Sequence, residues 1–169
     1  MAGDKFLYNN GGRITEKASI QSSAGASDAG KIPALDSAGK LDITMMPTGM
    51  GQDIISAEAS EALSAGDFIN LYNSSGLKMR KADATTAGKE ANGFVLTSVE
   101  NGATGTAYRQ GINNQLSGMT VGARQYLATT PGARTETAPS ETGNVVQFLG
   151  IALSSTEVFF EERDSFVLA

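Results

Sequence analysis

Hydrophobic and polar residues alternate most regularly in residues 145–153. Every second position there carries Val145, Gln147, Leu149, Ile151 or Leu153, and the positions between them become small after Phe148. A period of two is typical of a β-strand, and we expect the mainly aliphatic face to be buried. The polar residues 154–156 predict a tight turn, and residues 157–161 predict a second strand that completes a hairpin with one Phe buried.

Shorter alternating runs recur from residue 53 onward, separated by turns rich in Gly, Asn and Ser. They cover residues 53–59, 68–72, 77–82, 91–99, 104–112, 125–128 and 134–137. The turns at residues 63–66 and 119–122 have the same pattern, an apolar residue, a hydroxyl, a variable position and a Gly for which we expect a positive φ. Eight or nine short strands predict an all-β fold, an antiparallel β-barrel or sandwich, without a helix longer than about two turns. The tail, residues 161–168, fits either a last edge strand or a segment that docks on a partner.

The first 50 residues have a different pattern, because large apolar residues stand alone between polar and Gly-rich breaks. No periodicity lasts long enough there to close a core. The sequence therefore predicts an extended N-terminal arm or linker at residues 1–50 and a β-barrel-like domain at residues 51–169. Two interpretations of the first segment stay open, a flexible linker with consecutive turns at residues 28–32 and 37–41, or an arm whose apolar side chains enter pockets on neighbouring subunits. The anchors of such an arm are Phe6, Leu7, Tyr8, Ile14, Ile32, Leu35, Leu41, Met45 and Met46.

Composition and charge remove several classes of function. The 169 residues have a formal net charge of -5, so we expect neither nucleic acid nor an anionic membrane as a partner. The sequence has no Cys and no His, which excludes disulfides, thiolate nucleophiles, ordinary zinc sites and imidazole bases. Its start lacks the apolar core of a signal peptide, and no run approaches the roughly 20 apolar residues of a membrane span.

Candidate catalytic and ligand-binding groups are weak. The carboxylates of Asp53, Glu58, Glu61 and Asp67 lie beside turns or on alternating faces, where charge is ordinarily solvated. Residues 36–42 carry two Asp near a Gly but lack the ligand spacing of a calcium loop, so a plain turn is favoured. The basic cluster of Lys78, Arg80 and Lys81 fits a solvated face or a salt-bridging rim better than a nucleic-acid groove. We therefore expect no enzyme activity and no cofactor.

Several strand and turn segments resemble a β-domain of structural proteins of tailed bacteriophages. They are residues 81–95, 116–127 and 143–157, and residues 30–47 are similar to a linker that precedes such domains. A small β-domain with an N-terminal arm resembles above all a capsid decoration, or cement, protein.

That resemblance implies a protein of the outer capsid surface, assembled in the bacterial host cytoplasm. It would bind the major capsid protein, bridge and stabilise its subunits, and form a homo-oligomer, specifically a homotrimer. The alternative is a tail or fibre module that binds a host receptor or glycan, which an exposed aromatic patch around Tyr72, Tyr108 or Tyr126 would favour.

Overall fold

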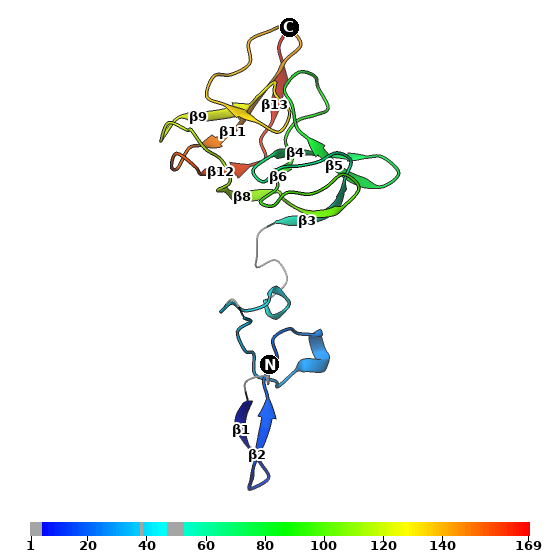
Figure 1. Cartoon of the computed structure of the whole chain (residues 1–169), viewed down its shortest axis with the longest axis vertical. Helices are drawn as coiled ribbons and strands as arrows, with labels where there is room; N and C mark the ends of the chain where they lie inside the picture. Colours follow the sequence, from blue (N-terminus) through cyan, green and yellow to red (C-terminus); the bar gives the residue numbers. More distant parts are fainter. Residues whose placement is uncertain (1–4, 38, 47–52) are drawn as a thin grey trace. The chain divides into compact units, whose positions relative to one another are not determined.

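The structure, a computed structural model, describes residues 5–37, 39–46 and 53–169 (Figure 1). The chain forms two compact units, Met1–Gly51 and Gln52–Ala169, and each is described by itself. The boundary expected at residues 50 and 51 lies outside the described residues. We call the two parts unit 1 and unit 2.

Short strands make up most of the regular structure, and the only helical segments among the described residues are two 3-10 turns in unit 1. Unit 1 contains β1 (Lys5–Asn10), β2 (Arg13–Ala18), η1 (Gly25–Asp28) and η2 (Ile43–Met45). Unit 2 contains β3 (Ile54–Ala59), β4 (Phe68–Asn73), β5 (Leu77–Lys81), β6 (Gly93–Phe94), β7 (Thr104–Tyr108), β8 (Gln110–Asn113), β9 (Arg124–Leu127), β10 (Arg134–Thr135), β11 (Val145–Ile151), β12 (Val158–Glu161) and β13 (Ser165–Val167). The predicted all-β class is confirmed.

A closed barrel in the order β3-β5-β4-β6-β7 forms the first half of unit 2. Four of its five pairings are antiparallel, but β3 and β5 run parallel, with Glu58 opposite Lys78 and Ala59 opposite Met79. Five strands in a closed ring cannot alternate direction all the way round, so at least one neighbouring pair has to be parallel. The expected antiparallel pairing therefore holds for the other four pairs of the barrel and not for β3 with β5.

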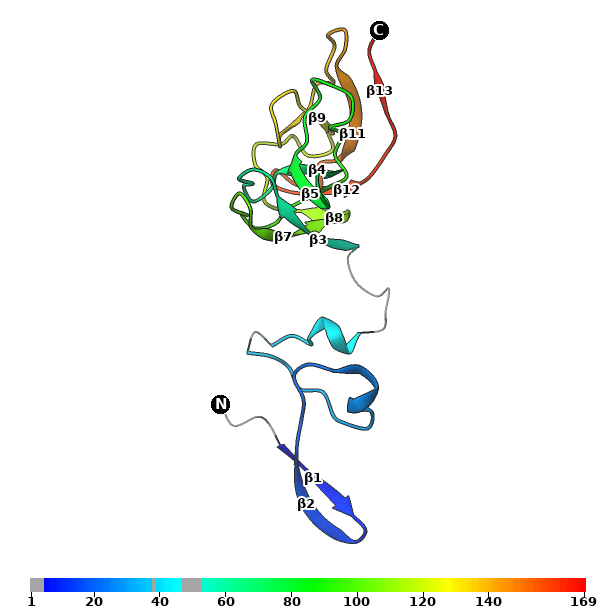
Figure 2. The same cartoon turned by 90° about the vertical axis from the view of Figure 1, so that its right-hand side faces the viewer.

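The second half of unit 2 adds a four-stranded sheet in the order β10-β9-β11-β13 and a ribbon of β12 with β8. Figures 1 and 2 place the barrel and the four-stranded sheet at opposite ends of unit 2. The chain passes from the barrel to the ribbon at Arg109, whose N–H donates to the Asp53 carbonyl at 2.7 Å. The single strand expected over residues 104–112 is therefore two strands, β7 and β8, in different sheets.

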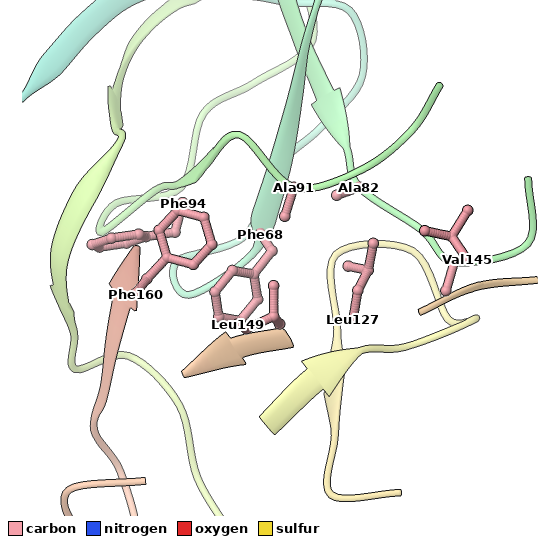
Figure 3. Packing of buried hydrophobic residues seen from close by; sticks show 9 residues of the cluster. Phe68, Ala82, Ala91, Phe94, Leu127, Val145, Leu149 and Phe160 are labelled. Atoms are coloured by element: carbon pink, nitrogen blue, oxygen red, sulfur yellow. The ribbon is translucent and has the colours of Figure 1, made fainter. Parts of the chain in front are cut away.

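The main hydrophobic core joins the barrel to the second half of unit 2 (Figure 3). Phe68 of β4 and Phe94 of β6 lie against Phe160 of β12, with ring centroids 5.6 and 5.9 Å from it. Leu127 and Leu149 complete the contact from β9 and β11, and all five side chains are fully buried. Burial of a Phe or Leu side chain stabilises the folded state by roughly 1.5–3 kcal/mol. This cluster therefore holds the two halves of unit 2 together.

A β-bulge in β11 changes which of its residues are buried. Between Phe148 and Gly150 the strand advances two residues while its partner β9 advances one, from Tyr126 to Gln125. The inserted residue reverses the alternation beyond it, since side chains alternate with a period of two. Val145, Gln147 and Leu149 are buried as predicted, but Ile151 and Leu153 are exposed and Ala152 is buried instead. The prediction for Ile151 and Leu153 was wrong for this reason.

The hairpin predicted over residues 145–161 is reduced to a single bridge. Ala152 and Val158 form an isolated antiparallel bridge, after which β12 pairs with β8 along its whole length. Phe160 is buried and Phe159 is not, in agreement with the expectation of one buried Phe. The tail forms an edge strand, because β13 pairs with Val145 to Gln147 at the end of its sheet.

The two matching turns have the predicted backbone. Gly66 and Gly122 have φ values of 93° and 81°. The backbone N–H that follows each Gly donates to a backbone carbonyl, Asp67 N–H to the Ser64 carbonyl at 3.1 Å and Ala123 N–H to the Thr120 carbonyl at 3.0 Å. The first turn directly precedes β4 and the second directly precedes β9, and both strands contribute to the core.

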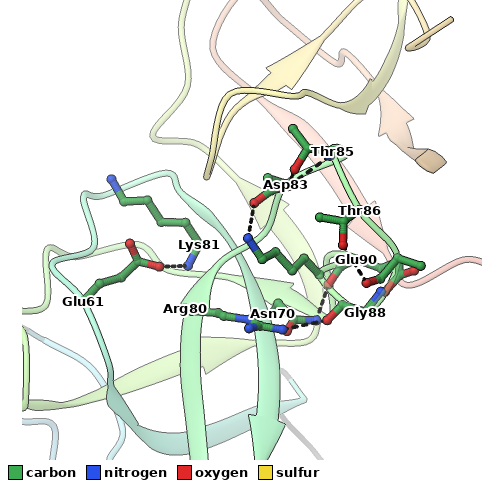
Figure 4. A network of polar contacts seen from close by, with 11 residues as sticks. Glu61, Asn70, Arg80, Lys81, Asp83, Thr85, Thr86, Gly88 and Glu90 are labelled. Atoms are coloured by element: carbon green, nitrogen blue, oxygen red, sulfur yellow. Dashed lines mark hydrogen bonds and ion pairs between the residues drawn. The ribbon is translucent and has the colours of Figure 1, made fainter. Parts of the chain in front are cut away.

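A polar network fixes the loop after β5 (Figure 4). The buried carboxylate of Asp83 accepts hydrogen bonds from the Thr85 N–H at 3.0 Å, from the Thr85 hydroxyl and from Lys89 Nζ at 3.1 Å. Burial alone would raise the pKa of Asp83, but these hydrogen bonds and the charge of Lys89 outweigh it and lower the pKa. The charged form of Asp83 therefore stabilises the folded state.

We expect this stabilisation to disappear in acid. A folded-state pKa below the unfolded value of about 4 adds stability above that pH, which is lost as the pH falls through the folded pKa. Asp83→Asn should therefore lower the free energy of unfolding at neutral pH, and its difference from the wild type should shrink below about pH 4. Urea unfolding across this pH range measures the effect, with Asp164→Asn, which removes an exposed carboxylate, as the control. A deficit that does not change with pH would contradict the assignment.

Candidate functional site

A β-hairpin at the start of unit 1 carries the first four predicted anchors. Its strands β1 and β2 pair in register from Lys5 opposite Ala18 to Asn10 opposite Arg13. Gly11 and Gly12 form the turn with φ values of 61° and 92°, which only Gly adopts readily. The sequence pattern predicts a break in structure at this Asn- and Gly-rich stretch, whereas the structure has the hairpin turn there.

Each face of the hairpin carries two large apolar side chains. Leu7 and Ile14 lie on one face, since their positions alternate in the same sense along the ladder, and they are 77% and 65% exposed. Phe6 and Tyr8 lie on the other face, where Lys17 Nζ sits 5.0 Å from the centre of the Tyr8 ring. Of these four side chains only Phe6 is half-buried.

Two loops after the hairpin carry the other predicted anchors. Ile20 pairs with the 32–34 segment through backbone hydrogen bonds, from Ile20 N–H to the Ile32 carbonyl at 3.0 Å and from Ala34 N–H to the Ile20 carbonyl at 2.7 Å. Ile32 lies in this segment and Leu35 directly after it, and both are exposed. Leu41 and Met46 lie on the two sides of η2 and are also exposed. Met45 is half-buried. The structure thus brings four predicted anchors together on the hairpin and leaves five on the loops.

Charged side chains fix the turn around η1, inside the first of these loops. The carboxylate of Asp28 accepts the Ala24 N–H at 2.6 Å and the Lys31 ammonium at 2.6 Å. The Ala24 hydrogen bond, followed by that of Lys31, lowers the pKa of Asp28. Local polar contacts therefore shape unit 1.

The described part of unit 1 contains no hydrophobic core. Among the side chains that the structure describes between residues 5 and 46, none is buried. An isolated two-stranded hairpin is marginally stable in water, and it needs a further layer or strand on its apolar faces for stability. The exposed apolar side chains of unit 1 are therefore available to a partner.

The other candidates from the sequence form no chemical site. Lys78 and Lys81 are engaged by Glu58 at 2.9 Å and Asp67 at 3.3 Å, so they belong to internal ion pairs. Arg80 donates to the Gly88 carbonyl at 2.7 Å and covers the Tyr72 ring at 4.3 Å. No three carboxylates gather to hold a metal ion within the described residues, and none of the helical segments described could cross a membrane.

The three tyrosines considered for a receptor patch are half-buried and lie apart in the fold. Tyr72 lies under Arg80, Tyr108 stacks on Phe94, and Tyr126 packs edge-on against Phe148. The exposed aromatic side chains of unit 2 are instead Phe159 and Phe166. Sequence reasoning missed Phe159 as a surface residue because adjacent Phe residues do not reveal which one is buried.

Comparisons with known proteins give one structural likeness. No family model and no curated protein matches the sequence. Among solved structures, the chain is similar to the head fiber gp8.5 N base of bacteriophage phi29, with 12% sequence identity and a TM-score of 0.44. The match covers 68% of this chain and 99% of that chain.

Proposed function

We propose that this chain is a structural protein of a tailed-phage head, a decoration or cement protein of the outer capsid surface. In this proposal unit 1 binds the major capsid protein, and unit 2 associates with other copies as a homotrimer. The protein bridges capsid subunits and stabilises the shell, without catalysis, a cofactor, nucleic acid or a membrane. It joins the virion in the bacterial host cytoplasm.

One observation carries the proposal: unit 1 exposes most of its predicted apolar anchors, and none of its described side chains is buried. Such a segment gains little by folding alone but gains stability when a partner covers it. Spaced anchors on several linked copies give avidity, because every contact after the first forms at a high effective concentration. The sequence resemblance to phage structural proteins supports a capsid as that partner.

The first test is binding to purified capsids that lack the protein. The double variant Leu7→Ser, Ile14→Ser should bind at least about tenfold more weakly, since each buried aliphatic side chain contributes about 1.5–3 kcal/mol. Deletion of residues 2–40 should abolish binding and leave the thermal unfolding of unit 2 unchanged. Co-sedimentation with capsids measures both.

Leu77→Ser is the matched control, because Leu77 is exposed but lies on β5 of unit 2. It should bind capsids like the wild type. Full capsid binding by the 2–40 deletion would overturn the role of unit 1. Binding to whole host cells and not to capsids would support the receptor or glycan module instead.

A further inference from the structure

Unit 2 has an apolar surface that its own fold leaves uncovered. Register places Arg124 opposite Ile151 and Phe159 opposite Ile112, and the Ala152–Val158 bridge brings Ile151 alongside Phe159. A row of side chains thus crosses β9, β11, β12 and β8. We call the apolar set Ile112, Phe148, Ile151, Leu153 and Phe159 the outer face.

The outer face is exposed because the opposite sides of the same strands fill the core. Leu149, Val158 and Phe160 point inward and are fully buried. Ile112, Ile151, Leu153 and Phe159 are 42–50% exposed. A hollow of about 180 Å³ is lined by Phe148, Ile151 and Phe159, with Glu161 and Arg163 also lining it. A contiguous apolar surface with a hollow and a polar rim marks a binding site for another protein.

Two charged side chains beside the outer face, Arg124 and Glu157, have no ion-pair partner within residues 53–169. The Arg124 guanidinium lies over the Phe148 ring at 5.6 Å and forms no ion pair within residues 53–169. Glu157 lies on β12's side of the face, next to Leu153, and its carboxylate likewise has no ion pair in that range. The lysines of unit 2 and Arg109, Arg134 and Arg163 have carboxylate partners. Arg80 also has no ion pair in that range, but it donates to the Asn70 side chain and to the Gly88 carbonyl.

Arg124 and Glu157 lie on the two sides of Ile151 and Leu153. A positive and a negative group placed in this way suit a closed ring of identical subunits. In such a ring the same two groups meet at every interface, so Arg124 of one copy can face Glu157 of the next. The apolar side chains then pack between them and lose their contact with water. An unrelated partner would have to supply both charges in matching positions, whereas a second copy already has them.

We infer that the outer face binds a second copy of this chain, with Arg124 of one copy against Glu157 of its neighbour. The inference rests on the proposed association of unit 2 into an oligomer, and it names the surface and the residues that form the contact. It assigns unit 1 to the capsid and the outer face to the neighbouring copy.

Sedimentation equilibrium of the full chain tests the inference. The wild type should be oligomeric, and Phe159→Ser and Ile151→Ser should each weaken association at least tenfold. Leu77→Ser should associate like the wild type. Circular dichroism melts check that the variants are folded. A monomeric wild type at all concentrations, or folded face variants that associate normally, would overturn the inference.

Charge reversal gives a second test that does not depend on removing apolar contacts. Arg124→Glu should weaken association, and the added change Glu157→Arg should restore it. Absence of restoration would overturn the pairing of these two residues. Capsid binding separates the proposal for unit 1 from the inference on the outer face. Variants of the outer face should lose association but still bind capsids through unit 1. Variants of the hairpin should lose capsid binding but stay oligomeric.

Discussion

Replacing Gly150 with Ala is expected to lower the free energy of unfolding by about 3–5 kcal/mol, the combined cost of a strained φ and of overpacking. Gly150 has a φ of 148°, and a Cβ there would lie 2.2 Å from the Phe159 carbonyl oxygen and 2.9 Å from Val158 Cγ1. The obstacle is backbone, so β11 and β12 would have to separate at the bridge that joins them. Chemical denaturation of the purified protein measures the change.

Gly143→Ala is the matched control for this substitution. Gly143 also has a positive φ, 87°, but a Cβ there meets nothing within 4 Å. We expect it to cost only about 1–2 kcal/mol, from the left-handed backbone alone. An equal decrease in the free energy of unfolding in the two variants would show that the close contact of Gly150 with β12 adds no cost.

Replacing Gln147 with Leu is expected to destabilise unit 2 by about 2–5 kcal/mol, because each buried backbone group left without a partner costs about 1–3 kcal/mol. The Gln147 side chain is buried and bonds both backbone groups of Ala91, accepting its N–H at 2.7 Å and donating to its carbonyl at 2.9 Å. Leu has a similar volume but leaves both groups unpaired. The measurement is again the free energy of unfolding in urea.

Gln115→Leu serves as the control, since Gln115 is exposed and its side chain bonds only the neighbouring Asn114. Its stability should stay within about 0.5 kcal/mol of the wild type, as is usual for surface substitutions. A Gln147→Leu variant as stable as the wild type would mean that Ala91 finds other partners.

The sequence predicted the β class of unit 2 well, because its strands keep a period of two and its turns contain Gly where the backbone needs it. Gly66 and Gly122 are examples, since the matching turn patterns indicated their positive φ in advance. Periodicity does not reveal a bulge, however. The exposed side chains of Ile151 and Leu153, and with them the outer face, could not be found from the alternation.

Pairing partners were predicted less well than strands. Residues 157–161 lie directly after β11 and read as its hairpin partner, but β12 pairs with β8, about 45 residues earlier in the chain. Gln147 was placed on the inward face, yet its contact with Ala91 depends on a segment 56 residues away. Such long-range contacts leave no local signal in the sequence.

For unit 1 the apolar positions were predicted and their arrangement was not. Phe6, Leu7, Tyr8 and Ile14 lie on a hairpin whose turn, Gly11–Gly12, resembles a flexible break when it is read without its flanking strands. Their role as anchors for the capsid stays a prediction until binding is measured.

The parallel pairing of β3 with β5 has a consequence for synthesis on the ribosome. β3 is the first strand of the barrel to leave the ribosomal exit tunnel. Its parallel partner β5 follows some 20 residues later and its antiparallel partner β7 some 50 residues later. One edge of β3 can therefore pair once β5 has emerged, but the other edge stays unpaired until β7, which ends at Tyr108, has emerged. Only then can the ring close. The carboxylates of Asp53, directly before β3, and of Glu58, within it, help to keep the unpaired strand from pairing with other nascent chains.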